Sequence, residues 1–318
     1  MRRFHSRLTY GFGILLLVSG AVAFCGCGSR MQAQKKNVAE LLNEITTGAN
    51  DRAKIAAIHE LATRPDSSTV TALIVALQDR STPVRKAAVA ALSRFNDARA
   101  KDALWDATRD TSQSVDFQVA AASALAHLHD ARSADPLIQA LPFALSKASA
   151  GLMELGQAAV PPLTDALHRA EIRDTVSKIL ASIGAPAVDP LIQLLHNDYD
   201  KYARLAAART LGEIDDPHAA NALTETLRAP NTEFVAAVYR FLIRRGQPGA
   251  ESALVAALNA YGNPAMAEDF ASSGNAALKT AAESWAGKSG FPLGERTSEL
   301  PQVHWASVDP KRGPGPAP

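Results

Sequence analysis

The chain repeats itself with a period of about thirty residues, and this repeat constrains the fold more than any other feature. Segments such as TALIVAL (71–77), DPLIQAL (135–141) and DPLIQLL (189–195) share one leucine. These leucines stand 26 to 33 residues apart and form a first column: Leu73, Leu104, Leu137, Leu163, Leu191, Leu223 and Leu254. A second column follows the first by about twenty residues in each unit. It consists of Leu92, Leu125, Leu152, Leu180, Leu211 and Leu242. With VAELLNEI (38–45) and AAIHELAT (56–63) at the start, the chain holds eight units.

Each unit is predicted to be a helical hairpin. In the second segments apolar residues recur at helical spacing, as in Val84, Ala88, Ala91, Leu92 and Phe95. No segment alternates with period two for long enough to predict a strand. A single hairpin of this kind cannot bury its apolar face alone, so the units are expected to stack and share one core.

Start and stop signals support the hairpins. Asp135-Pro136 and Asp189-Pro190 are predicted to start first helices, with the aspartate as the capping residue. Gly156, Gly184 and Gly246 are predicted to end second helices, because glycine adopts a positive φ easily.

Composition agrees with closely packed helices. Apolar residues make up 47% of the chain but aromatic residues only 6%, so the core must be built from Ala, Leu, Val and Ile. Without Arg2, Arg3 and Arg7 of the N-terminus, 30 basic residues face 32 acidic ones, which is a net charge of −2. Nucleic acid is therefore excluded as an expected partner, because its binding needs a basic surplus.

These segments resemble the HEAT-repeat family, in particular the short bacterial PBS-lyase HEAT-like repeats. The resemblance rests on the D-x-L-x-x-x-L first helix, on the Val84-Arg85 opening of a second helix, and on A-x-x-L-G-x-I-D at 208–215. It implies an all-α fold, a right-handed α-α superhelix (a HEAT/armadillo-like solenoid) of about eight helical hairpins. We expect the solenoid to span residues 38–290, with a C-terminal capping unit at 249–290.

The same resemblance implies a structural ladder between neighbouring units. Asp79 precedes Arg85 by six residues and Asp198 precedes Arg204 by six, which matches the family's bridging positions. Arg173 occupies the corresponding place in another unit. These five residues are expected to bridge units, with ligand binding as the alternative for the arginines.

The first thirty residues have the order of a secretory signal: basic residues 1–10, the apolar run 11–24 and then small residues. The apolar run is shorter than the roughly 20 residues that a membrane-spanning helix needs. Two kinds of processing remain open. Ala21-Val22-Ala23 fits ordinary cleavage, whereas Phe24-Cys25-Gly26-Cys27 resembles a bacterial lipobox, although its Phe24 departs from the usual aliphatic residue.

We therefore predict a signal peptide at 1–26, lipidation at Cys27 and a polar tether at 27–37. The chain would be exported and anchored by lipid in the periplasm or on the outer face of a membrane. Residues 291–318 are rich in Pro and Gly without periodicity and are predicted to be a disordered tail.

No catalytic, cofactor or metal site is predicted. His59-Glu60 is the one His-Glu pair, too few for the di-iron site of the deoxyhypusine hydroxylase type, and Thr63 stands where a zinc HExxH needs its second histidine. His127 and His129 are two residues apart and so point to different sides of a helix. Residues 28–318 contain no cysteine that could act as a nucleophile.

The remaining expectation concerns surface. In HEAT arrays the second helices line the concave side, and counting from each column leucine places a mostly small and apolar strip there. The predicted partner-binding groove is represented by Lys86, Val119, Met153, Leu205, Tyr239 and Ile243. Contiguous exposed apolar surface usually marks an interaction site. The alternative is that these small residues only allow neighbouring helices to approach closely.

The expected function is a non-catalytic, monomeric scaffold at the bacterial cell envelope that binds a protein or peptide partner in this groove. An alternative of another class is a lyase-like HEAT enzyme or an accessory factor of an enzyme. The fold alone does not decide between them, because one fold carries many functions.

Overall fold

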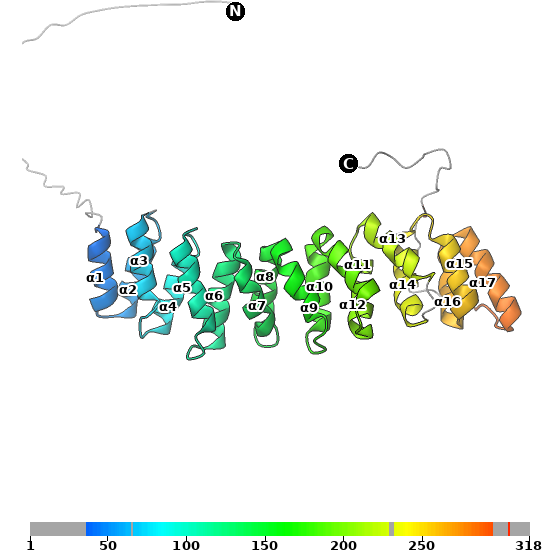
Figure 1. The fold of residues 1–318 in the computed structure, drawn as a ribbon, viewed down its shortest axis with the longest axis horizontal. Helices are drawn as coiled ribbons and strands as arrows, with labels where there is room; N and C mark the ends of the chain where they lie inside the picture. Colours follow the sequence, from blue (N-terminus) through cyan, green and yellow to red (C-terminus); the bar gives the residue numbers. More distant parts are fainter. Residues whose placement is uncertain (1–35, 65, 229–231, 295–304, 306–318) are drawn as a thin grey trace, which may run out of the picture. The chain divides into compact units, whose positions relative to one another are not determined.

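The computed structural model describes residues 36–64, 66–228, 232–294 and 305, and within them the chain is entirely helical (Figure 1). It contains seventeen α-helices and no strand in this described part. Cys27, the predicted signal peptide and most of the predicted tether and tail lie outside the described residues.

The helices form seven consecutive hairpins followed by an end of three helices, in which α15 and α16 both pack on α17. The first helices are α1 (Val38–Thr47), α3 (Ser67–Ala76), α5 (Ala98–Arg109), α7 (Ala134–Ala140), α9 (Val160–Ala166), α11 (Val188–Asn197), α13 (Pro217–Thr226) and α15 (Glu251–Tyr261). The second helices are α2 (Asp51–Leu61), α4 (Thr82–Leu92), α6 (Val115–His127), α8 (Leu145–Leu155), α10 (Arg173–Ile183), α12 (Lys201–Glu213) and α14 (Thr232–Arg245). Helices α16 (Pro264–Ala271) and α17 (Ala276–Ser289) complete the end of the array together with α15.

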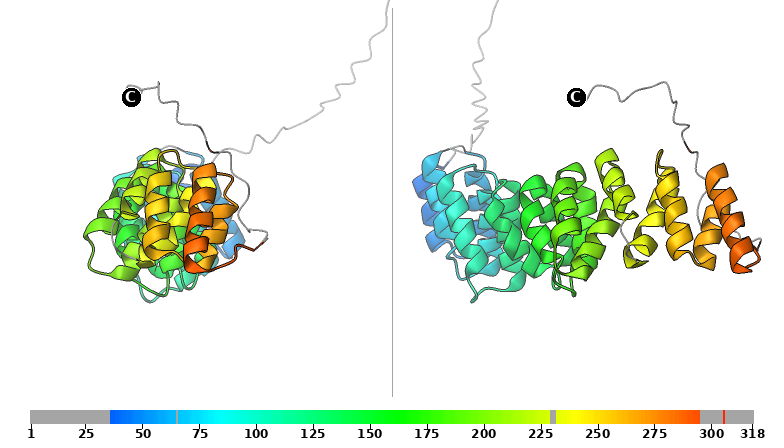
Figure 2. Two further views of the ribbon diagram at one scale, coloured as in Figure 1. Left: turned by 90° about the vertical axis from the view of Figure 1, so that its right-hand side faces the viewer. Right: turned by 45° about the vertical axis from the view of Figure 1, so that its right-hand side comes forward.

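Successive units stack in sequence order, as the colours in Figure 1 and in the right-hand view of Figure 2 show. From α2 to α14 each second helix packs against the second helix of the next unit, and from α1 to α5 and from α7 to α15 the first helices do the same less extensively. The predicted solenoid of about eight hairpins is therefore confirmed.

A column of aspartates starts several first helices. Asp66, Asp97 and Asp216 each stand seven residues before a column leucine, and each accepts a hydrogen bond from a backbone N–H of the first turn. Sequence reasoning placed the caps at Asp135 and Asp189, and this was wrong. Helices α7 and α11 begin at Ala134 and Val188, so both aspartates lie inside the first turn. There they still face the positive end of the helix dipole.

Glycine replaces this aspartate in two of the units. Gly156 and Gly184 end α8 and α10 with φ of 59° and 78°, and Gly246 follows α14 with φ of 58°. The predicted helix ends at these glycines are confirmed. After Gly184 a short 3-10 turn, η3 (Ala185–Ala187), leads directly into α11, which explains why the linkers between these units are short.

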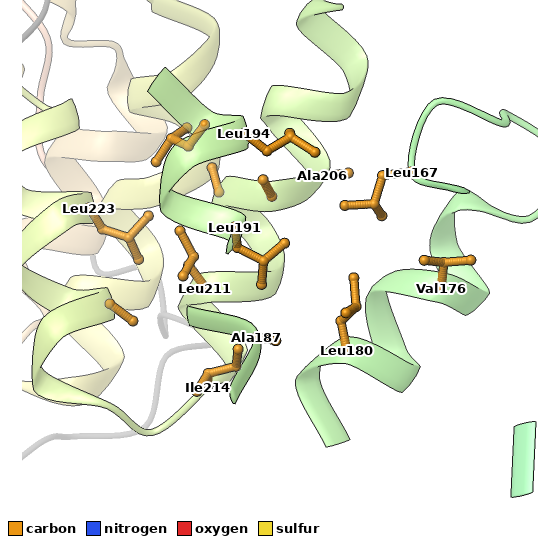
Figure 3. Close-up of a cluster of buried hydrophobic side chains, with 14 of the residues drawn as sticks. Leu167, Val176, Leu180, Ala187, Leu191, Leu194, Ala206, Leu211, Ile214 and Leu223 are labelled. Atoms are coloured by element: carbon orange, nitrogen blue, oxygen red, sulfur yellow. The ribbon is translucent and has the colours of Figure 1, made fainter. Parts of the chain in front are cut away.

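The core follows the two leucine columns. All thirteen column leucines are completely buried. In the first unit the buried leucine of the first helix is Leu41, whereas Leu42 is only partly buried. Figure 3 shows how Leu191 and Leu223 from first helices meet Leu180 and Leu211 from second helices in one continuous cluster. Burial of each such side chain contributes about 1.5–3 kcal/mol, so the columns contribute substantially to stability.

The last units differ from the regular hairpins. Helix α17 packs against both α15 and α16, and it ends at Gly290 in the left-handed conformation. Trp305 lies in the predicted tail, yet its indole N–H donates to the backbone carbonyl of Ser273 at 3.0 Å, and its ring packs on the core. Trp305 thus fixes part of the predicted tail to the turn between α16 and α17.

Candidate functional site

The exposed side of the second helices is the candidate site, and its register is set by the column leucines. A helix turns by about 100° per residue, so the residues two before and two after each leucine lie on the opposite side of the helix. The central position, two before the leucine, is occupied by Ala90, Ser123, Ala150, Lys178, Arg209 and Arg240. None of these six residues is buried.

Three of the six predicted groove residues are on this surface. Met153 is 46% exposed, and Lys86 and Leu205 are partly exposed. Val119, Tyr239 and Ile243 are only 2%, 5% and 0% exposed, so assigning them to a partner-binding groove was wrong.

The error has a geometric cause. The predicted positions lie about 60 to 120° around the helix from the leucine. This direction points toward the next unit and not toward solvent. Helix α6 shows this plainly, because Phe117 and Leu125 pack in the core of the preceding units while Val119 packs in the core of the following ones. A second helix is buried on two sides, and the arc left for solvent is narrow.

Tyr239 illustrates what such a position does. Its hydroxyl donates to Asp269 of α16 at 2.8 Å, and its ring lies 6.1 Å from Phe270. Burial, followed by the hydrogen bond to Asp269, raises the pKa of Tyr239 to about 12. Arg240 donates to the same carboxylate at 2.9 Å, so Tyr239, Arg240 and Asp269 together connect α14 with α16. Tyr239 therefore joins neighbouring units.

A hollow of about 430 Å³ lies on the exposed side of α4, α6 and α8, and we call it the second-helix hollow. Its floor consists of small residues and one valine: Val89, Ala90, Ala120, Ala124, Ala150 and Gly151. Its rim carries polar and charged side chains: Lys86, Ser93, Ser123, His127, Lys147 and Glu154. Small floor residues leave room for a side chain from a partner.

Asp116 of α6 clamps the rim of this hollow. Its carboxylate accepts a hydrogen bond from Lys147 of α8 at 2.6 Å and another from Lys86 of α4. The bond from Lys147, followed by that from Lys86, lowers the pKa of Asp116 to about 2. One exposed carboxylate thus connects three consecutive units.

On the opposite rim, His127 of α6 approaches Glu154 of α8. The His127 Nδ1 atom is 2.6 Å from the Glu154 carboxylate, and both side chains are exposed. The hollow therefore has the ion pairs of Asp116 at one end of its apolar floor and the contact of His127 with Glu154 at the other. This mixed rim differs from the strip of small and apolar residues that the sequence predicted.

A second, smaller hollow of about 260 Å³ lies between α10 and α12. Lys178, Arg209, Asp174 and Glu213 line it together with Leu205. It is more polar than the second-helix hollow, because charged residues replace the alanines of the floor.

The predicted ladder residues lie where neighbouring units meet. Asp79 accepts a hydrogen bond from Lys54 of the preceding unit at 2.7 Å. Arg85 donates to the Asp79 carbonyl at 2.8 Å and reaches forward to Gln113 at 2.8 Å. Burial raises the pKa of Asp79, but the hydrogen bonds from Lys54 and the Ser81 N–H lower it below its usual value. Asp79 and Arg85 do not pair with each other through their side chains, and each contacts another unit.

The other ladder residues follow the same pattern. Asp198 accepts from His168 of the preceding unit at 3.0 Å. Arg173 and Arg204 donate to the carbonyls of Leu167 and Leu195 at 2.6 and 2.8 Å, which satisfies the last carbonyls of the first helices.

Each of the three ladder arginines also lies over an aromatic ring of the next unit. Arg85 lies 5.5 Å from the Phe117 ring, and the pairs Arg173 with Tyr202 and Arg204 with Phe234 are 5.7 and 4.9 Å apart. Such contacts contribute about 0.5–1 kcal/mol each at exposed sites. Sequence reasoning missed the aromatic partners, although they recur about thirty residues after each arginine.

Two further observations concern chemistry and membranes. In the part of the chain that the structure describes, no group of three His, Cys, Asp or Glu side chains could hold a metal ion. Among the same residues, none of the helices combines the length and apolarity needed to cross a bilayer.

Comparison with known families agrees with this architecture. The profile of HEAT repeats matches residues 38–118 and 188–265, which together are half of the chain. The chain belongs to the HEAT-repeat family. The profile of the PBS lyase HEAT-like repeat also matches residues 117–141 of this HEAT-repeat protein. A comparison with curated proteins gave no match.

Two solved structures are similar to most of the chain at low identity. Human deoxyhypusine hydroxylase in complex with glycerol is 17% identical with a TM-score of 0.34, and the match covers 80% of this chain and 96% of that one. The complex of CpcE and CpcF of phycocyanin lyase from Nostoc sp. is 18% identical with a TM-score of 0.35, covering 79% and 95%. At these identities and TM-scores the likeness says nothing about activity.

Proposed function

We propose that this HEAT-repeat protein is a non-catalytic scaffold that binds a protein segment on the exposed side of its second helices. The observation that carries the proposal is the second-helix hollow, whose apolar floor lies between the ion pairs of Asp116 and the contact of His127 with Glu154. A hollow of this size accepts an aliphatic side chain, and the charged rim would align the polar backbone and flanking residues of the partner.

The proposal extends to the cellular setting. The chain would be exported to the bacterial cell envelope and anchored through a lipid on Cys27, because residues 1–27 have the pattern of a signal followed by a lipobox-like segment. Metabolic labelling with a fatty acid tests this step by comparing the parent with Cys27→Ala. Label on the parent alone is expected, and equal labelling of both, or of neither, would exclude a lipid at Cys27.

Photo-crosslinking tests the binding surface. A photoreactive residue is placed at Ala120 or Ala150 in the hollow, and at Val75 on α3 as a control that is also exposed and apolar. One partner is expected to crosslink from both hollow positions and not from Val75. The crosslinked protein is then purified separately and its binding to the parent chain is measured.

A blocking variant completes the test. Ala150→Glu introduces a larger, charged side chain into the hollow, whereas Val75→Glu introduces the same group on a first helix. We expect at least a tenfold loss of affinity for the purified partner with Ala150→Glu and little change with Val75→Glu. Equal crosslinking from all three positions, or unchanged affinity of Ala150→Glu, would show that the hollow is not the binding site.

A further inference from the structure

The central position of the second helices changes character along the array. It is small in the first half, with Ala90, Ser123 and Ala150, and basic in the second half, with Lys178, Arg209 and Arg240. We name these last three residues the basic column. They occupy the same place in three consecutive second helices, α10, α12 and α14, which pack against one another.

The basic column faces solvent. All three residues are exposed, and Arg209 and Lys178 line the hollow between α10 and α12. Arg240 keeps half of its side chain exposed while it donates to Asp269. Exposed cations in a row attract carboxylates of a partner and speed its approach.

Charges of both signs flank the column. Asp174 and Glu213 lie beside Lys178 and Arg209, and Arg244 lies one turn beyond Arg240. The flanking acids make the position of a bound carboxylate matter, because a displaced carboxylate would meet Asp174 or Glu213. Charge complementarity therefore selects both the sign and the register of an occupant.

The spacing of the column suits an extended chain. Packed helices lie about 8–10 Å apart, and an extended segment in the polyproline II conformation rises about 3.1 Å per residue with three residues per turn. Every third side chain of such a segment points to the same side, so successive cations on neighbouring helices match every third residue of a segment that crosses the helices.

We propose that the basic column binds an extended acidic protein segment with carboxylates at every third position. This inference rests on the proposed function, since it names the chemistry of the segment that continues beyond the second-helix hollow. The partner would place an apolar residue over α4, α6 and α8 and its acidic residues over α10, α12 and α14.

A defined peptide tests this inference without the natural partner. The probe is a fluorescein-labelled peptide with Glu at every third position and Ala and Ser between, and its binding to the full chain is followed by fluorescence anisotropy at low salt. The comparison peptides have the same composition with the Glu residues clustered, or carry Lys in place of Glu. We expect the spaced Glu peptide to bind most tightly and to lose affinity as salt increases.

Two variants with the same change of charge identify the surface. The column variant is Lys178→Ser with Arg209→Ser, and the matched control is Lys279→Ser with Lys288→Ser on α17, where both lysines are also exposed. The column variant should weaken binding by about threefold to tenfold and the control should leave it unchanged. Unchanged thermal unfolding of both variants shows that they fold.

The outcomes separate this inference from the proposed function. Failure of the spaced peptide to bind, equal weakening by both variants, or equally tight binding of the clustered peptide would overturn the inference. None of these results depends on crosslinking from the second-helix hollow. Conversely, a partner that crosslinks to Ala120 but reaches α10 to α14 with a segment lacking acidic residues would leave the proposed function standing and refute the acidic occupant.

Discussion

At the scale of single residues, side chains that hold neighbouring units together lie next to those available for binding. Tyr239 and Arg240 are consecutive, yet Tyr239 is buried against α16 whereas Arg240 is half exposed. Both reach the same carboxylate of Asp269, which is itself buried. Substitutions at these two positions should therefore separate stability from binding.

Tyr239→Phe should lower the free energy of unfolding by about 1–2 kcal/mol, because it removes a buried hydrogen bond to the Asp269 carboxylate and leaves the bond from Arg240. Binding of the spaced Glu peptide should not change. Urea unfolding followed by circular dichroism measures the first effect and fluorescence anisotropy the second. A Tyr239→Phe variant of unchanged stability that fails to bind would show that the hydroxyl faces the partner.

Two glycines on helices should respond to alanine in opposite ways. A Cβ at Gly212 would lie 2.4 Å from the Phe241 ring, whereas a Cβ at Gly287 would contact nothing within 4 Å. Gly212→Ala should destabilise the chain by about 1–3 kcal/mol through overpacking. Gly287→Ala should stabilise it by about 0.5–1 kcal/mol through helix propensity. Thermal unfolding compares both with the parent, and a change of the same sign in both would contradict the close contact of α12 with α14.

At the scale of helices, the leucine columns and the aspartate column have the same period. The leucine columns are easy to recognise in the sequence, whereas the aspartate column is not. The leucines are predicted correctly because burial on one side of every helix imposes helical spacing on the sequence. The caps at Asp66, Asp97 and Asp216 were missed because Asp135-Pro136 and Asp189-Pro190 have the same local chemistry one turn later. The exposed arc was misplaced because it depends on packing against both neighbouring units, which a single-helix count does not include.

The Asp116 clamp between α4, α6 and α8 should make stability depend on pH in a narrow acid range. The folded pKa of about 2 lies below the ordinary value of 3.8, so the clamp is fully present above about pH 4 and is lost as the pH falls toward 2. Asp116 is half exposed, so solvent screening limits the contribution to about 0.2–1 kcal/mol.

Asp116→Asn should therefore be less stable than the parent by that amount at pH 7, and the difference should vanish near pH 2. Asp106→Asn is the control, because Asp106 is also exposed. Urea unfolding at a series of pH values gives the comparison. A difference between parent and Asp116→Asn that grows as the pH falls below 4 would contradict the direction of the pKa shift.

At the scale of the whole molecule, stability is distributed along the array, because each unit packs mainly on its neighbours. A local defect should then open nearby units while distant ones stay protected. The end of the array is the clearest place to see this, since α17 packs on α15 and α16, and Trp305 contacts the turn between α16 and α17. The contact of Trp305 could not be predicted, because the surrounding residues 291–318 show no periodicity.

Trp305→Ala should increase amide hydrogen exchange in α15, α16 and α17 and leave α1 to α8 unchanged. The alanine removes both the ring packed on the core and the hydrogen bond to the Ser273 carbonyl, which together should contribute about 1–3 kcal/mol to the last units. Trp305→Phe keeps a ring without the N–H and should have an intermediate effect. Hydrogen exchange read by mass spectrometry resolves the helices separately. Uniform loss of protection along the chain would mean that the array unfolds as one cooperative unit, and no loss in α15 to α17 would mean that Trp305 does not hold the end of the array.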